Sequence, residues 1–156
     1  MSSFFDVSEI GQFAIKIEEN GEKFYRYAAK IAKDDKVKQM FEYLADEENN
    51  HKVTFQKILL TIKQYEPHES YSGEYGLYLK AYIDNIIFAN LDEERSRVKD
   101  TLSAIKFGMQ RELESILYYQ EIKNFLKNEQ EVIDTIIEEE RKHFSTLSEL
   151  KKKYST

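Results

Sequence analysis

Apolar residues recur every three or four positions along four long stretches of the chain, at about 8–33, 36–65, 98–127 and 129–152. This spacing puts them on one side of a helix, so the pattern predicts four amphipathic helices. The connection at 66–97 begins with the turn-rich sequence PHESYSGEYG and then carries a shorter apolar helix over about 77–89. A connection of this length can cross a whole bundle. The pattern therefore predicts an all-α four-helix bundle with a long crossover that carries a short extra helix.

Two of the apolar stripes continue through a glutamate and a histidine. The stripe of the second helix passes through Glu48 and His51, and the stripe of the fourth passes through Glu140 and His143. Residues three positions apart share a helix face, so both pairs are expected to point into the core. A buried carboxylate needs a cation or hydrogen-bond donors, and a metal ion would supply the charge. In the acidic run 138–140, only Glu140 lies on the inward stripe.

The two halves of the chain look like copies of one unit. Glu18 is followed by Tyr25 seven positions later, and Glu112 is followed by Tyr119 at the same spacing. Each of these glutamates precedes the Glu-x-x-His motif of its own half by a similar distance, 30 and 28 residues. Each half is therefore predicted to be one helix hairpin. The expected organisation is a single domain, 1–156, with hairpins at about 8–65 and 98–152 joined by the crossover 66–97.

Two such hairpins around a pseudo-twofold axis would bring four carboxylates and two imidazoles together. A carboxylate-rich set with imidazole suits iron or manganese. Four ionised carboxylates carry a charge that two divalent ions would neutralise. Each histidine would bind through one ring nitrogen, and its other ring nitrogen would need a hydrogen-bond acceptor.

The composition excludes several other kinds of site. The sequence has no cysteine, which excludes disulfides, thiolate-bound metals, iron–sulfur clusters and cysteine nucleophiles within it. A net charge of −6 without a basic stripe disfavours nucleic acid and anionic membranes as partners. No apolar run is long enough to span a bilayer, and the first residues lack the pattern of a secretion signal. We therefore expect a cytoplasmic protein.

In these motifs the sequence resembles the ferritin-like di-iron carboxylate proteins, and among them the rubrerythrin-like group. The resemblance covers nearly the whole chain and implies a ferritin-like bundle that binds two iron ions, with manganese as the alternative. It also implies that Tyr25 and Tyr119 lie next to the ligands, and that the partners are oxygen or hydrogen peroxide, an unidentified electron donor and a second copy in a homodimer. The implied metal ligands are Glu18, Glu48, His51, Glu112, Glu140 and His143.

The sequence also departs from the patterns of this group. Rubrerythrins carry a rubredoxin domain whose iron is held by four cysteines, and this sequence has none. They have an extra glutamate three residues after the third-helix ligand, where this chain has Ser115. The ligand set is closer to the symmetric four-Glu, two-His set of bacterioferritins. Those proteins bind haem through a methionine that here is Asn49, so no haem is expected.

Other interpretations of individual residues stay open at this point. Acidic neighbours surround Glu18 and Glu112, as they would on a solvated helix face. The two tyrosines could be ordinary core aromatics. His68 follows a proline in a polar loop and is expected to be exposed without a catalytic role. The aromatic residues of the crossover could form a dimer contact or simply cover the bundle; they are Tyr71, Tyr75, Tyr78 and Tyr82.

Three functions fit the sequence. The leading hypothesis is oxidation–reduction chemistry at a di-iron or di-manganese centre, of the ferroxidase or peroxidase kind, in oxidative stress or iron handling. The second is metal binding or iron handling without turnover. The third is a structural bundle in which the metal site is vestigial.

Overall fold

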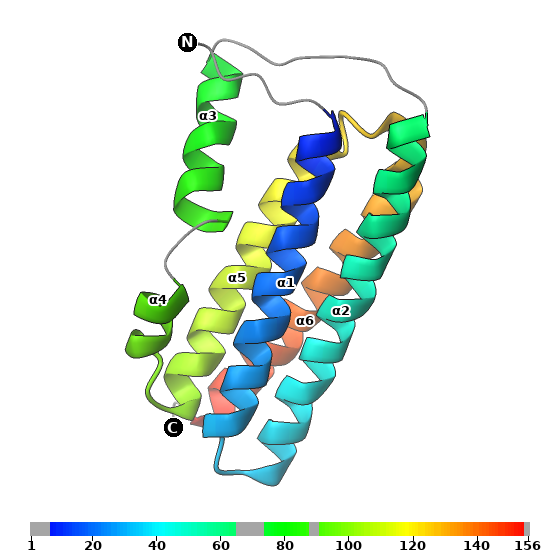
Figure 1. The fold of residues 1–156 in the computed structure, drawn as a ribbon. Coiled ribbons are helices and arrows are strands. Elements are labelled where there is room, and N and C mark those ends of the chain that lie inside the picture. The colour runs from blue at the N-terminus through cyan, green and yellow to red at the C-terminus, as the bar shows by residue number, and fades with distance from the viewer. Residues whose placement is uncertain (1–6, 65–73, 88–90, 155–156) are drawn as a thin grey trace.

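The computed structural model describes residues 7–64, 74–87 and 91–154, and four long helices dominate it (Figure 1). These helices pair into two hairpins, α1 with α2 and α5 with α6. The described residues contain no strand, so the predicted all-α bundle is confirmed. The α2 and α5 helices run in the same direction, as expected for a bundle with a crossover (Figure 1). The four helices are α1 (Val7–Ile31), α2 (Asp35–Gln64), α5 (Thr101–Ile122) and α6 (Gln130–Tyr154).

The crossover contains more structure than the single helix expected at 77–89. Helix α3 (Glu74–Tyr82) continues into a π-helical turn, Ile83–Ile87, and a second short helix, α4 (Leu91–Arg97), follows. The α4 sequence LDEERSR is polar and spans about two helical turns, so it offers no apolar periodicity to detect. Long-range hydrogen bonds hold the crossover on the bundle: the Asn20 side chain donates to the Ile87 carbonyl at 2.8 Å, and the Tyr82 hydroxyl donates to the Glu114 carbonyl.

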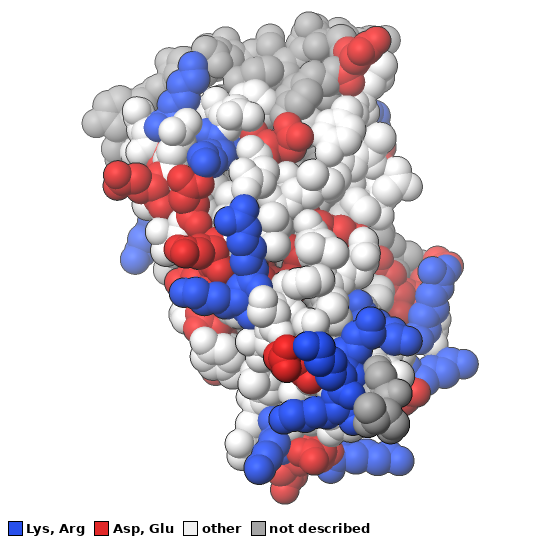
Figure 2. Space-filling model, turned by 180° about the vertical axis from the view of Figure 1, so that it is seen from behind, with Lys and Arg blue, Asp and Glu red and all other residues white. Residues whose placement is uncertain are grey.

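Local hydrogen bonds, a turn and charge explain the ends of α5 and α6. Helix α5 starts with a capping box, in which Asp100 accepts from the Ser103 amide at 2.7 Å and the Ser103 hydroxyl accepts from the Asp100 amide at 3.1 Å. The helix ends at Ile122, five residues before the expected boundary, because the chain turns there and continues into a short 3₁₀ helix, Lys127–Glu129. Lysines fill the last turn of α6, where positive charge stabilises the helix C-terminus. Figure 2, which views the molecule from behind, shows basic side chains gathered at its lower end.

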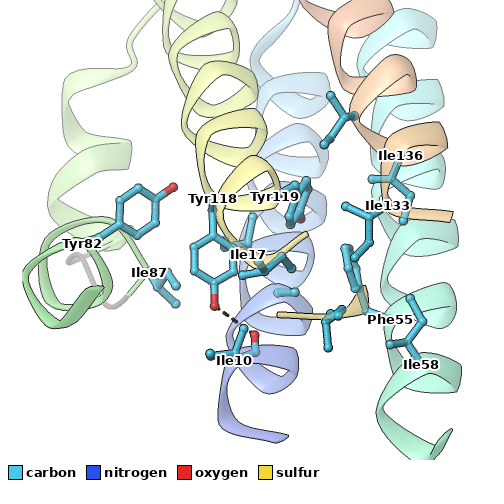
Figure 3. Close-up of a cluster of buried hydrophobic side chains, with 14 of the residues drawn as sticks. Ile10, Ile17, Phe55, Ile58, Tyr82, Ile87, Tyr118, Tyr119, Ile133 and Ile136 are labelled. Carbon is cyan, nitrogen blue, oxygen red and sulfur yellow. Dashed lines mark hydrogen bonds between the residues drawn. The ribbon is translucent and has the colours of Figure 1, made fainter. Parts of the chain in front are cut away.

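The buried core has two apolar clusters with polar residues between them. One cluster includes Ile17, Phe55 and Ile133 and is shown in Figure 3, where the Tyr118 hydroxyl donates to the Ile10 carbonyl at 2.9 Å. The other cluster lies toward the opposite end of the same four helices and includes Phe24, Phe41, Leu44, Ile105 and Leu147. The positions between them on each long helix are occupied by buried glutamates and histidines. The fold thus places a polar layer in the middle of an apolar bundle.

Candidate metal centre

The structure brings all six predicted ligand residues into this polar layer. Their exposed fractions are 5% or less, although glutamate is almost never fully buried unless it is paired. Each of the four long helices contributes to the layer, because the inward stripe of each helix passes through it. The six residues are Glu18 on α1, Glu48 and His51 on α2, Glu112 on α5, and Glu140 and His143 on α6.

These side chains form two overlapping groups that could each hold a metal ion. Within each group, the candidate ligand atoms lie within 4.8 Å of one another. Each group has three carboxylates and one imidazole, and both groups share Glu48 and Glu140. The remaining members are Glu18 with His51 in one group and Glu112 with His143 in the other. This arrangement gives two adjacent ligand groups of equal composition, as expected from the sequence repeat.

Both histidines turn the same ring nitrogen toward the cluster. The Nδ1 atom of His51 lies 2.7 Å from Oε1 of Glu140, and that of His143 lies 4.0 Å from Oε2 of the same residue. The two carboxylate oxygens of Glu140 therefore face different histidines. The imidazole rings lie 5.9 Å apart between centroids, with an interplanar angle of 24°. Glu140 is thus placed to join the two groups.

Several potential ligand atoms in the layer lack a hydrogen-bond partner among the described residues. Buried polar atoms are normally satisfied, so this concentration of unsatisfied ones requires an explanation. All can offer a lone pair to a cation, and the carboxylate oxygens among them cannot be satisfied by their acidic neighbours once these are ionised. A pair of divalent cations would satisfy them, and oxygen and imidazole ligands fit iron or manganese. The atoms are Oε2 of Glu18, Nδ1 of His51, Oε2 of Glu112, both carboxylate oxygens of Glu140 and Nδ1 of His143.

Burial also changes the proton affinity of the four carboxyl groups. It raises the pKa of Glu18 to about 7, although hydrogen bonding to Glu48 and Tyr119 opposes the shift. Burial, together with the neighbouring carboxylates, raises the pKa of Glu48 and Glu140 well above the usual value. Burial acts on Glu112 in the same direction, but hydrogen bonds with neighbouring groups outweigh it and lower its pKa. Without cations, the cluster is therefore expected to retain protons near neutral pH.

The two tyrosines singled out by the repeat hydrogen bond to ligand candidates of the opposite hairpin. The Tyr25 hydroxyl on α1 donates to Oε1 of Glu112 on α5, at 2.5 Å. The Tyr119 hydroxyl on α5 donates to Oε1 of Glu18 on α1. Both tyrosines are buried, and each leaves the second oxygen of its glutamate without a hydrogen bond. Each hydroxyl therefore fixes one carboxylate oxygen and leaves the other facing the cluster.

Some residues around the site were not identified from the sequence. Glu139 was placed with the surface charges, but its Oε2 atom lies 2.6 Å from Nε2 of His51. The only available signal was the need of a ligand histidine for an acceptor on its other nitrogen. Gly21 leaves room for a ligand candidate, since a Cβ atom there would lie 3.0 Å from Cδ of Glu48 and would displace that side chain. In the sequence, the counterpart of Gly21 in the second half is the similarly small Ser115, three residues after Glu112.

Other sequence predictions have mixed outcomes. Among the aromatic residues of the crossover, Tyr82 is buried and stacks on Tyr118, with 5.5 Å between ring centroids, so it covers the bundle. Tyr78 is 41% exposed. His68 and Tyr71 lie outside the described residues, as does the side chain of Tyr75. Among the helices that the structure describes, none is long and apolar enough to cross a membrane.

Comparisons with known proteins place this geometry in context. The family model described as rubrerythrin matches residues 9–151. A crystal structure described as a candidate ferritin-like diiron-carboxylate protein from Thermotoga maritima matches with a TM-score of 0.75 and 28% sequence identity, over 99% of each chain. No functionally curated protein shows significant similarity to the chain.

Proposed function

The chain belongs to the rubrerythrin family, has a ferritin-like fold, and carries a glutamate and histidine cluster suited to metal. On this premise we propose that the cluster binds two iron ions, or two manganese ions, and reduces oxygen or hydrogen peroxide. The proposal includes a separate electron donor, a homodimer and a cytoplasmic location, as the sequence analysis expected. The proposed ligands are Glu18, Glu48, His51, Glu112, Glu140 and His143.

The observation that carries this proposal is the pair of buried groups sharing Glu48 and Glu140. A single structural cation would need only one such group. Two adjacent groups of three carboxylates and one imidazole instead favour two ions held close together by shared carboxylates. Ions so placed can act jointly on one small molecule. The buried, unsatisfied carboxylate oxygens give a physical reason for both ions to bind.

The chemistry attributed to the metals is electron transfer to the bound oxidant, and the protein supplies their environment. Tyr25 and Tyr119 would hold one oxygen of Glu112 and Glu18, respectively, and so orient these ligands. Burial and nearby carboxylates raise the pKa of both tyrosines well above the usual value, which keeps their protons in place. The apolar clusters on either side would exclude bulk water from the layer.

A surface groove supports access by a small oxidant. The groove has a volume of about 350 Å³ and lies between α2 and α6, with His51 among its lining residues. Its other walls include Glu47, Asn50, Thr54 and Glu139. The groove is large enough to admit water, oxygen or hydrogen peroxide, and it reaches the buried layer at His51. We therefore place the route to the proposed metal pair on the His51 side.

The test is a single-turnover experiment with iron. The metal-free protein is loaded anaerobically with two equivalents of Fe²⁺ and mixed rapidly with oxygen or with hydrogen peroxide. The proposal predicts oxidation much faster than that of free Fe²⁺, followed by the near-ultraviolet absorption of ferric iron. Glu140→Ala should abolish the acceleration, and the exposed neighbour substitution Glu138→Ala should not. Oxidation at the rate of free iron in the wild-type protein would refute the proposal.

A second candidate is metal handling without repeated turnover. The observation that favours it is the absence of cysteine from the 156 residues, so they contain no thiolate-bound iron to return electrons to the site. Repeated additions of oxidant with a chemical reductant distinguish the two. Sustained consumption supports the redox enzyme, whereas one burst that reductants do not restore supports metal handling.

A further inference from the structure

The two ring nitrogens of His51 contact two consecutive glutamates of α6. Its Nδ1 atom lies 2.7 Å from Oε1 of Glu140, inside the cluster. Its Nε2 atom lies 2.6 Å from Oε2 of Glu139, on the outer side of the ring. The histidine is 3% exposed and the Glu139 side chain is 41% exposed, so this contact marks the boundary between the buried layer and the groove.

This contact suits one tautomer of a metal-bound imidazole. An ionised carboxylate can only accept a hydrogen bond, and one faces each ring nitrogen of His51: Glu140 lies 2.7 Å from Nδ1 and Glu139 lies 2.6 Å from Nε2. A metal ion bound at Nδ1 would use the lone pair of that atom and leave the ring proton on Nε2, where Glu139 can accept a hydrogen bond. The opposite tautomer would place a proton where the metal ion is expected and would set the lone pairs of Nε2 and Glu139 against each other at 2.6 Å.

The other half of the site is arranged differently, despite the sequence repeat. Glu47 precedes Glu48 just as Glu139 precedes Glu140, so symmetry would pair Glu47 with His143. Glu47 instead groups with His51 and Glu139, with candidate ligand atoms within 4.8 Å of one another. Next to His143 lies the ring of Tyr43, edge-on at 6.4 Å between centroids. Glu47 also shares a hydrogen bond with the Tyr43 side chain, which raises the pKa of this tyrosine.

We infer that Glu139 is a positioning residue for His51, and that it makes the two proposed metal positions unequal. This inference rests on the proposed di-metal function. By accepting a hydrogen bond from Nε2–H, Glu139 favours the metal-binding tautomer, fixes the ring orientation and increases the basicity of Nδ1. The metal position next to His51 therefore depends on Glu139, whereas the position next to His143 does not.

The experiment compares metal binding and the histidine tautomer in matched variants. Metal-free wild-type protein and the variants Glu139→Ala, Glu139→Gln and Glu138→Ala are titrated anaerobically with Co²⁺, whose visible spectrum reports its ligands. Glu139→Ala should retain one tight position and weaken the other by about 10- to 100-fold. Glu139→Gln keeps an amide oxygen that can accept the hydrogen bond from Nε2–H and should restore part of the affinity. Glu138→Ala removes the same charge from an exposed neighbouring position and should match the wild type.

Nitrogen NMR of the diamagnetic Zn²⁺-loaded proteins measures the chemical shifts of the histidine ring nitrogens, which a general loss of fold stability would not change. The His51 ring should carry its proton on Nε2 in the wild type and lose the hydrogen-bonded shift of that nitrogen in Glu139→Ala. Equal affinity at both positions in Glu139→Ala, or an unchanged Nε2 signal, would overturn the inference while leaving the proposed function intact. Failure of the wild type to bind two ions would instead refute the proposed function, and the inference with it.

Discussion

The Tyr25 hydroxyl donates a hydrogen bond to Oε1 of Glu112 across the interface of the two helix hairpins, at 2.5 Å. The sequence repeat provides the reverse connection, from Tyr119 to Glu18. Each hairpin therefore orients the single glutamate of the other, and neither half of the site is complete alone. This reciprocity links the packing of the bundle to the geometry of the proposed metal centre.

Removing one of these hydroxyls should destabilise the metal-free protein. Tyr25→Phe leaves Oε1 of Glu112 buried without its donor, and the expected loss in the free energy of unfolding is about 1–3 kcal/mol. Chemical denaturation in the presence of a chelator measures it. Tyr27→Phe is a suitable comparison, because its hydroxyl hydrogen bonds only to carbonyls at the bundle edge, at 3.2 and 3.4 Å. An equal loss in both variants would contradict a special role for the Tyr25–Glu112 contact.

The stability of the metal-free protein should fall as the pH rises. The pKa of Glu18 is about 7 in the folded protein and near 4.5 in the unfolded chain, so between these values the folded state binds more protons. The contribution of Glu18 to the free energy of unfolding is complete below about pH 4.5 and is lost as the pH rises through about 7. The raised pKa values of Glu48, Glu140 and His143 act in the same direction.

Melting temperatures measured with a chelator between pH 5 and 8 test this dependence. Glu18→Gln should reduce the slope, because the amide has no proton to lose. With excess Mn²⁺ the dependence should weaken or reverse, since the ligands must lose protons to bind the ion. A metal-free protein that becomes more stable toward pH 8 would show that the buried carboxyl groups do not retain protons as argued.

Metal binding should stabilise the folded protein by linkage. At a free ion concentration 100 times the dissociation constant, the expected gain is about 2.7 kcal/mol for each site. His143→Ala should lose much of this gain, whereas Glu138→Ala should keep it. Differential scanning calorimetry with and without Mn²⁺ measures the effect. A melting temperature that the ion leaves unchanged would favour the structural bundle with a vestigial site.

Gly21 should matter more for metal binding than for folding. In Gly21→Ala the new Cβ atom would lie 3.0 Å from Cδ of Glu48, so this shared carboxylate must move. Alanine is also about 1 kcal/mol more favourable than glycine inside a helix, and this gain offsets part of the strain in the metal-free protein. We expect a small change in stability and a clear loss of Mn²⁺ affinity, measured by calorimetric titration. Unchanged affinity would show that Glu48 tolerates the displacement.

The sequence predicted the bundle from helix periodicity, and the composition of the site from periodicity together with the internal repeat. Glu48 and Glu140 stood out because they interrupt apolar stripes, and Glu18 and Glu112 because the two halves repeat. The structure places all of them in one buried layer, and their role as metal ligands stays a prediction. The family membership and the all-α bundle are confirmed.

The features that escaped prediction depend on tertiary contacts. Helix α4 is too short and polar to give a periodic signal, and the end of α5 is set by a turn near Leu126. Glu139 resembles any exposed helix glutamate in the sequence, and only the approach of α2 reveals that it contacts His51. The inequality of the two halves arises in the same way, from the position of Glu47 in three dimensions.

Anomalous X-ray diffraction at the iron edge tests the central claim most directly. Crystals are grown anaerobically with Fe²⁺ and measured on both sides of the edge. The proposal predicts two iron peaks in the buried layer, one next to His51 and one next to His143, with Glu48 and Glu140 between them. No peak in this layer, or iron bound only at surface carboxylates, would contradict it.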